Sequence, residues 1–224
     1  MNNLQKRILT SLIIFPLSIF FIIQGGYYLL SFLFIIFLIA NYELFSVFNK
    51  KIIILFLDLI LILSLFSIYA LRHDFYYLNN PLYDQESFVL LIWVIILCIC
   101  SDIGGYIFGK TFKWKKLTKI SPNKTLSGVL GSFIFSLFSV FIVDFLLTSN
   151  TVYFLQAKFY FLAIIFSLTA QAGDLTISFF KRLEKVKDTG KILPGHGGML
   201  DRLDSLVFAA PYAFLTLKII DYVS

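Results

Sequence analysis

Seven long runs of hydrophobic residues divide the chain, and short polar segments separate them. The runs lie approximately at residues 8–24, 27–48, 52–71, 87–108, 126–147, 152–172 and 206–222. A helix that crosses the hydrocarbon core of a bilayer needs about 20 apolar residues, and each run is close to that length. The pattern therefore predicts an all-α fold, a polytopic transmembrane helical bundle of about seven spans.

Composition supports this prediction. Hydrophobic residues make up 59% of the chain and charged residues only 14%, whereas soluble domains have about 45–50% and about 25%. Too little polar surface remains to cover a water-facing globule, which excludes an ordinary soluble enzyme, a disordered chain and a fibrous repeat. Cys98 and Cys100 are two apart in an apolar run, so they form neither a disulfide framework nor a zinc site.

The charge distribution predicts the orientation. The chain has 19 basic and 13 acidic residues, a net charge of +6. If the N-terminus is cytoplasmic and the spans alternate, 16 of the 19 basic residues fall in cytoplasmic segments, and only Arg72, Lys158 and Lys218 fall elsewhere. The positive-inside rule favours this arrangement, with the C-terminus outside. The basic excess then suits anionic lipid surfaces, and we expect no nucleic-acid partner.

The densest polar stretch covers residues 173–204 and combines carboxylates with cations. It contains four aspartates, Asp174, Asp188, Asp201 and Asp204, among six lysines and arginines and His196. Carboxylates hold Mg²⁺, Lys and Arg hold phosphate oxygens, and phosphoryl or nucleotidyl transfer needs both together. Asp201 and Asp204 are three apart and would share one face of a helix. The glycines of PGHGG, residues 194–198, would let backbone N–H groups approach an anion; the alternative is a tight surface turn followed by a helix cap.

Two further polar clusters precede this stretch. In SDIGGYIFGK, residues 101–110, Asp102 lies within an apolar span, where ionisable residues are functional candidates; the alternative is a glycine packing face with an Asp that reaches water. In SPNKTLSG, residues 121–128, Lys124 precedes an expected helix start and suits a phosphate contact, although the motif equally suits a turn and cap. Glu43 lies towards a span end, and we interpret it as reaching water. We therefore predict one integral membrane domain over 1–224, with scaffold spans at 8–71 and a catalytic half at 87–222.

The stretch SFFKRLEKVKDTGKILPGHGGMLDRLD, residues 178–204, resembles the signature of phosphatidate cytidylyltransferases, the CDP-diacylglycerol synthases of bacterial and eukaryotic membranes. GDL at 173–175 and the two preceding clusters occur in the same order in that family. The resemblance covers roughly the second half of the chain. Ser127 departs from the family, which often has an acid or Gln there. Family members can also have more spans than we count, and the shortfall falls before residue 87.

The resemblance implies a reaction in which CTP and phosphatidic acid give CDP-diacylglycerol and pyrophosphate. It also implies Mg²⁺, a possible second cation, a homodimer, contact with membrane lipids, and a bacterial-type plasma (inner) membrane location with the active loops cytoplasmic. The implied roles are as follows: catalytic, Asp201, Asp204, Lys181 and Arg182; phosphate-binding, Ser178, Lys124, Arg202, His196 and Lys187; metal-binding, Asp174, Asp201 and Asp102.

Three other functions would use some of the same sequence features. A CTP-dependent lipid kinase, similar to dolichol or phytol kinases, would use similar groups on a lipid alcohol, but the long 178–204 signature argues against it. CDP-alcohol phosphotransferases have a characteristic D-G-x-x-A-R string that is missing from this sequence. A transporter would place polar residues at mid-depth on several spans, and only Asp58 lies there.

Overall fold

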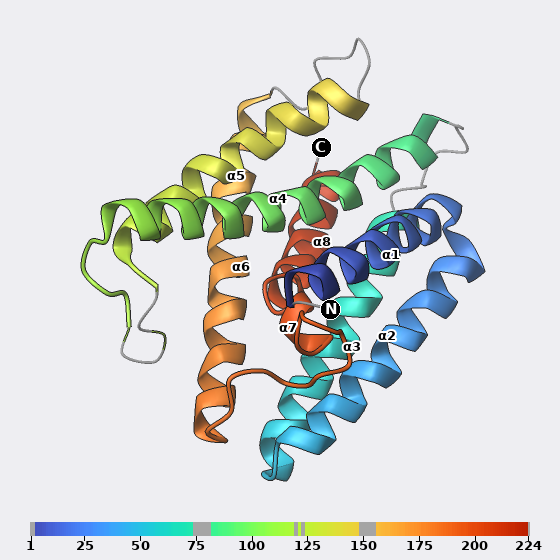
Figure 1. Ribbon diagram of the computed structural model, residues 1–224. Helices are drawn as coiled ribbons and strands as arrows, with labels where there is room; N and C mark the ends of the chain where they lie inside the picture. The colour runs from blue at the N-terminus through green and yellow to red at the C-terminus, as the bar shows by residue number, and fades with distance from the viewer. Residues whose placement is uncertain (1–2, 74–81, 119–120, 122–123, 148–155, 224) are drawn as a thin grey trace. The chain divides into compact units, whose positions relative to one another are not determined.

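A computed structural model describes residues 3–73, 82–118, 121, 124–147 and 156–223. These residues form eight helices and, in the ranges just given, no strand longer than an isolated bridge (Figure 1). The helices are α1 (Asn3–Gln24), α2 (Gly26–Val47), α3 (Lys51–His73), α4 (Leu82–Phe112), α5 (Leu126–Leu147), α6 (Ala157–Leu183), α7 (Leu200–Leu203) and α8 (Leu206–Val223). The predicted all-α class is confirmed.

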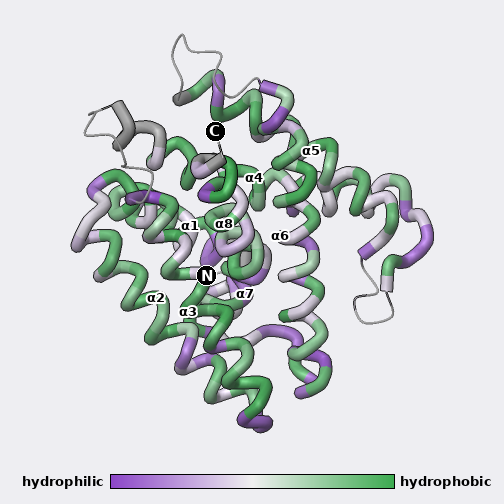
Figure 2. Tube along the Cα trace, turned by 180° about the vertical axis from the view of Figure 1, so that it is seen from behind, coloured by the Kyte–Doolittle hydropathy of each residue, from purple (hydrophilic) through white to green (hydrophobic). Residues whose placement is uncertain are grey.

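Six of these helices, α1 to α6, are long and apolar enough to cross a membrane, and the apolar part of α8, Leu206–Ile220, is shorter. Each of the seven predicted runs therefore corresponds to a helix, although the predicted start of the sixth run, residue 152, lies outside the described residues. Figure 2 shows hydrophobic residues along the long helices and hydrophilic ones at helix ends and in loops. The chain is a multi-pass membrane protein.

Two helices extend beyond their predicted ends, which corrects the prediction of loops there. We expected the sixth run to end near residue 172, but α6 continues to Leu183, so Asp174, Ser178 and Lys181 lie on a helix. The continuation retains apolar residues such as Ile177, which is fully buried. Lys181 and Arg182 occupy the last turn of α6, where cations interact favourably with the helix dipole. Similarly, α4 ends at Phe112 instead of residue 108.

The helices form two compact units. The first unit combines Met1–Phe88 with Phe180–Asp204, and the second combines Val89–Phe179 with Ser205–Ser224. The signature segment from Phe180 onward thus belongs to the same unit as α1 to α3, the helices we predicted to be scaffold. Within the first unit, α2 packs against both α1 and α3 (Figure 1).

Glycines bring α4 and α5 close together in the second unit. A Cβ added to Gly104 would clash with the Gly131 carbonyl, and one added to Gly131 would clash with the Gly104 carbonyl. A Cβ on Gly105 would lie 2.8 Å from Ser132 Oγ. Small residues allow such close backbone approach between membrane helices. The glycine packing face considered for residues 101–110 is therefore present. Asp102 lies on the same segment of α4.

Candidate active site

Asp201 joins three parts of the first unit. Asp201 is 8% exposed, and its Oδ1 accepts a hydrogen bond from Lys181 Nζ at 2.8 Å. Oδ2 accepts bonds from the backbone N–H groups of Thr189 at 2.8 Å and Gly198 at 3.0 Å. The end of α6, the following loop and the start of α7 are thus tied to one carboxylate. Breaking a buried ion pair of this kind by removing one partner costs about 3–5 kcal/mol.

The environment of Asp201 keeps it ionised. Burial alone would raise the pKa of this carboxyl. The hydrogen bond and charge of Lys181, together with the N–H groups of Gly198 and Thr189, outweigh burial, and the pKa is lowered. Hydrogen bonds to the charged form of a carboxyl have this effect. Asp201 therefore carries a negative charge at every physiological pH.

Glu43 is a site residue that our sequence reasoning missed. It lies near the end of α2 and is 1% exposed, so the interpretation that it reaches water is wrong. Oε1 accepts from the Met199 N–H at 2.9 Å, and Oε2 accepts from the Leu200 N–H at 3.0 Å and Thr189 Oγ1 at 3.1 Å. The first N–H groups of a helix have no partner within that helix. Glu43 supplies the missing acceptors at the start of α7.

Two glycines of the signature make room for Glu43. A Cβ on Gly190 would lie 2.6 Å from Glu43 Oε1, and one on Gly198 would lie 2.5 Å from Glu43 Oε2. Side chains at these positions would push the carboxylate out of reach of its donors. An ionisable residue within an apolar span is costly and marks a functional site by default. The same rule that marks Asp102 as a candidate also marks Glu43, so the sequence does contain a signal for this residue.

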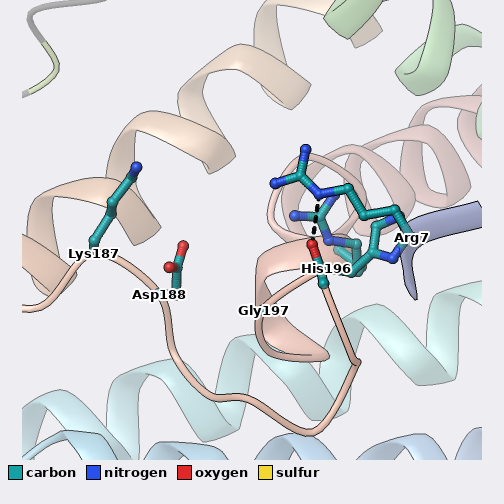
Figure 3. Close-up of a pocket in the computed structure, with 7 residues that line it drawn as sticks. Arg7, Lys187, Asp188, His196 and Gly197 are labelled. Atoms are coloured by element: carbon teal, nitrogen blue, oxygen red, sulfur yellow. Dashed lines mark hydrogen bonds between the residues drawn. The ribbon is translucent and has the colours of Figure 1, made fainter. Parts of the chain in front are cut away.

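The PGHGG segment forms a tight turn beside a cavity of about 440 Å³. Gly195 and Gly197 have φ angles of 80° and 86°, a region that favours glycine. The His196 N–H donates to the Leu193 carbonyl at 2.9 Å. The cavity is lined by the two glycines and by side chains of Arg7, Lys187, Asp188, His196 and Arg202. Figure 3 shows Arg7 and His196 on one side and Lys187 with Asp188 on the other.

The surroundings of His196 favour the neutral form of its imidazole. Burial lowers its pKa, and the positive charges of Arg202 and Arg7 lower it further. Nε2 lies 3.3 Å from Ser11 Oγ. Nδ1 is buried and has no hydrogen-bond partner among the described residues. A buried polar nitrogen without a partner is costly, so this atom is suited to a ligand.

The second unit holds four of the predicted residues around another cavity, of about 330 Å³. Lys124 Nζ pairs with Asp174 Oδ2 at 2.5 Å, and Ser178 Oγ donates to Asp174 Oδ1 at 3.2 Å, one turn along α6. Asp102, on α4, also lines this cavity and accepts from Ser205 Oγ at 3.0 Å. Residues from three separate motifs, at 101–110, 121–128 and 173–178, thus line one cavity.

The remaining candidates divide between local roles. Thr125 Oγ1 accepts from the Gly128 N–H at 3.1 Å and caps α5, so the turn-and-cap interpretation holds for Thr125, while Lys124 lines the cavity. Arg182 is exposed, and its Nη1 donates to the Val186 carbonyl at 2.8 Å. Asp204 ends α7. Among the described residues, no three His, Cys, Asp or Glu side chains form a group that would hold a metal ion by themselves.

A sequence profile of the cytidylyltransferase family matches residues 59–220. The chain belongs to the cytidylyltransferase family. The matched range contains every site residue that we predicted from the sequence, while Arg7 and Glu43 precede it. The site residues within the matched range divide between the two units. Those of the second unit are Asp102, Lys124, Asp174 and Ser178. Those of the first unit include Lys181, Lys187, His196, Asp201 and Arg202.

Individual relatives agree with the family assignment. The chain is 40% identical over 129 residues to a phosphatidate cytidylyltransferase of Helicobacter pylori, covering 57% of this chain and 47% of that protein. It is 43% identical over 133 residues to a phosphatidate cytidylyltransferase of Rickettsia felis, with 54% and 57% covered. It is 37% identical over 155 residues to the uncharacterised protein YnbB of Escherichia coli, with 68% and 50% covered. The chain spans about half the length of the curated relatives it matches.

Proposed function

We propose that this chain transfers the cytidylyl group of CTP to phosphatidic acid and releases CDP-diacylglycerol and pyrophosphate. The observation that carries the proposal is the pair of cavities in a membrane-spanning member of the cytidylyltransferase family. One is lined by Arg7, Lys187 and Arg202 beside Asp188. The other is lined by Lys124 beside Asp102 and Asp174. Two phosphate-bearing substrates need two such sites. The printed names of the Helicobacter and Rickettsia relatives support the same reaction.

The reaction needs no covalent intermediate on the protein. An oxygen of the lipid phosphate attacks the α-phosphorus of CTP, the bond from that phosphorus to the bridging oxygen breaks, and pyrophosphate leaves with the electron pair. Catalysis of this kind depends on positioning and charge neutralisation. Lys124 and Ser178 would hold phosphate in one cavity, and Lys187, His196 and Arg202 would do so in the other. Asp201 would fix the loop that carries the second group.

Asp102 and Asp174 fit a Mg²⁺ ion. They are carboxylates that line one cavity together with hydroxyl groups, which are the hard oxygen ligands Mg²⁺ prefers. Mg²⁺ sites commonly use one or two carboxylates plus substrate phosphates. When bound, the ion would neutralise charge on the phosphate oxygens. Asp201 already accepts three hydrogen bonds, and its role as a metal ligand stays a prediction, as does a second cation.

The proposed location is a bacterial-type plasma membrane, with the N-terminus and both charged loops cytoplasmic and the C-terminus outside. Lys and Arg in these loops obey the positive-inside rule in this orientation. A reporter fused after Ser224 tests the orientation, because a cytoplasmic signal would contradict it. We also propose a homodimer, which the mass of the purified protein in detergent would test.

The deciding experiment uses the full chain in detergent with phosphatidic acid, Mg²⁺ and CTP labelled in cytidine or in the γ-phosphate. We expect cytidine label in the lipid and γ-label in pyrophosphate. γ-Label in the lipid would indicate a lipid kinase and contradict the proposal. Asp144→Asn is a matched control for Asp174→Asn, because Asp144 lies elsewhere in the second unit, on α5.

A further inference from the structure

The first helix is fastened to the PGHGG turn by three polar side chains on one face. Arg7 Nε donates to the Gly195 carbonyl at 2.7 Å. The hydroxyl of Thr10 is shared between the Lys6 carbonyl of its own helix at 2.7 Å and the Pro194 carbonyl at 2.9 Å. Ser11 Oγ lies 3.3 Å from His196 Nε2. Residues at i, i+3 and i+4 share one face of a helix. The sequence pattern alone predicts only a membrane span for this helix.

Arg7 changes the character of the cavity beside the turn. Arg7, Lys187 and Arg202 contribute three positive charges and Asp188 contributes one negative charge, while the lowered pKa of His196 favours its uncharged form. The bond from Arg7 to Gly195 uses Nε, whereas the guanidinium has two further nitrogens in a planar fork that suits phosphate oxygens. His196 Nδ1 supplies another polar atom that no described residue satisfies. The cavity is therefore suited to a multiply charged anion.

The linings of the two cavities indicate which phosphate each one takes. Every residue of the described chain that lines the first cavity is charged, polar or glycine. The second cavity includes Leu117, Val129 and Leu175 beside Lys124, a mixed lining that suits the phosphate and apolar body of a lipid. A diphosphate has two charged ends and no apolar part, so it matches the first cavity.

We propose that Arg7 binds the β,γ-diphosphate of CTP, and the pyrophosphate released from it, in the cavity beside the PGHGG turn. The first helix is then part of the nucleotide site. That the diphosphate belongs to CTP rests on the proposed function, whereas recognition of the diphosphate itself does not. A charge-assisted hydrogen bond of this kind corresponds to about a 10- to 100-fold change in affinity.

The test measures binding of inorganic pyrophosphate to the purified full chain by calorimetry, without Mg²⁺. Arg7→Gln removes the charge but keeps a polar side chain. Lys6→Gln removes the same charge one residue away, from an exposed side chain that does not line the cavity. We expect Arg7→Gln to weaken binding about 10- to 100-fold and Lys6→Gln less than about twofold. Equal losses in both variants, or no binding to the wild type, would overturn the proposal.

A second measurement needs no variant. Phenylglyoxal modifies accessible arginines, and peptide mass spectrometry reports the modification of Arg7 in the wild-type chain. We expect pyrophosphate to protect Arg7 and micelles containing phosphatidic acid to leave it reactive. Protection by phosphatidic acid alone would assign the cavity to lipid and overturn the proposal. If Arg7 binds pyrophosphate but no cytidine label enters lipid, the proposed function fails alone; if label enters lipid and Arg7→Gln changes neither pyrophosphate binding nor the KM for CTP, the Arg7 proposal fails alone.

Discussion

Replacing Glu43 tests whether a carboxylate on α2 holds the signature segment in place. In Glu43→Gln, the amide oxygen can keep the bonds from Thr189 and Leu200, but the amide NH₂ then faces the Met199 N–H. Leaving one buried donor unsatisfied costs about 1–3 kcal/mol. In Glu43→Ala, two backbone N–H groups at the start of α7 lose their acceptor, which corresponds to about 2–6 kcal/mol.

The assay is the free energy of unfolding of the detergent-solubilised protein in a denaturing-detergent titration. Asp58→Asn is the matched control, because Asp58 is a half-buried carboxylate of the same unit that accepts a hydrogen bond from Asn41 Nδ2 at 2.8 Å. We expect this control to lose about 0.5–1.5 kcal/mol. A loss in Glu43→Ala no larger than that in Asp58→Asn would refute the anchoring role. Normal CTP turnover in a folded Glu43→Ala would show that the anchor does not position the site.

Three other variants test separate parts of the site. Lys181→Met leaves Asp201 buried without its cation and should lower the free energy of unfolding by about 3–5 kcal/mol. The control Arg182→Met, at an exposed position, should lower it by less than about 1 kcal/mol. Similar losses in the two variants would contradict a stabilising role for the buried ion pair. Asp174→Asn should lower cytidylyl transfer by about a hundredfold or more, with Asp144→Asn near the wild-type rate, and an unchanged rate at limiting Mg²⁺ would remove Asp174 from the metal site. The pKa of His196 is lower in the folded chain, so the unfolded chain takes up this proton first as the pH decreases. The free energy of unfolding should therefore decrease as the pH is lowered below about 6.5. His196→Gln should show a smaller decrease between about pH 7.5 and 5.5, and an equal pH dependence in the two proteins would contradict this.

The helices were predictable because their signal is local. Each of the seven apolar runs corresponds to a helix, and six of those helices are long enough to span a membrane, because the bilayer requirement for apolar length acts on each run separately. The end of α6 was not predictable in the same way. Hydropathy falls after residue 172, where Asp174, Ser178 and Lys181 enter, yet the helix continues because buried Ile177 still packs and Asp174 is paired with Lys124. Tertiary contacts stabilise polar residues in a helix at a position where the hydropathy pattern alone predicts a loop.

The same distinction explains which site residues were found. Asp102, Lys124, Asp174 and Ser178 lie in motifs with a recognisable chemistry, and the structure gathers them in one cavity. Glu43 and Arg7 have no motif around them. Each acquires its role from a partner more than 140 residues away, Thr189 for Glu43 and Gly195 for Arg7. The sequence shows that Glu43 is an ionisable residue within an apolar run, but it does not show which distant residues contact Glu43 or Arg7.

These two residues also change how the first three helices are understood. The family profile begins at residue 59, so α1, α2 and the start of α3 precede it. On sequence grounds they form a scaffold whose only requirement is to be apolar. Yet Glu43 supplies the acceptors for α7, and Gly190 and Gly198 of the signature leave room for its carboxylate because they lack side chains. Arg7 donates a hydrogen bond to the PGHGG turn. Because the loop has few apolar residues of its own to bury, its conformation depends on acceptors and donors from these helices. We therefore expect a substitution of Arg7 in α1 or of Glu43 in α2 to alter the conformation of this loop without touching a signature residue.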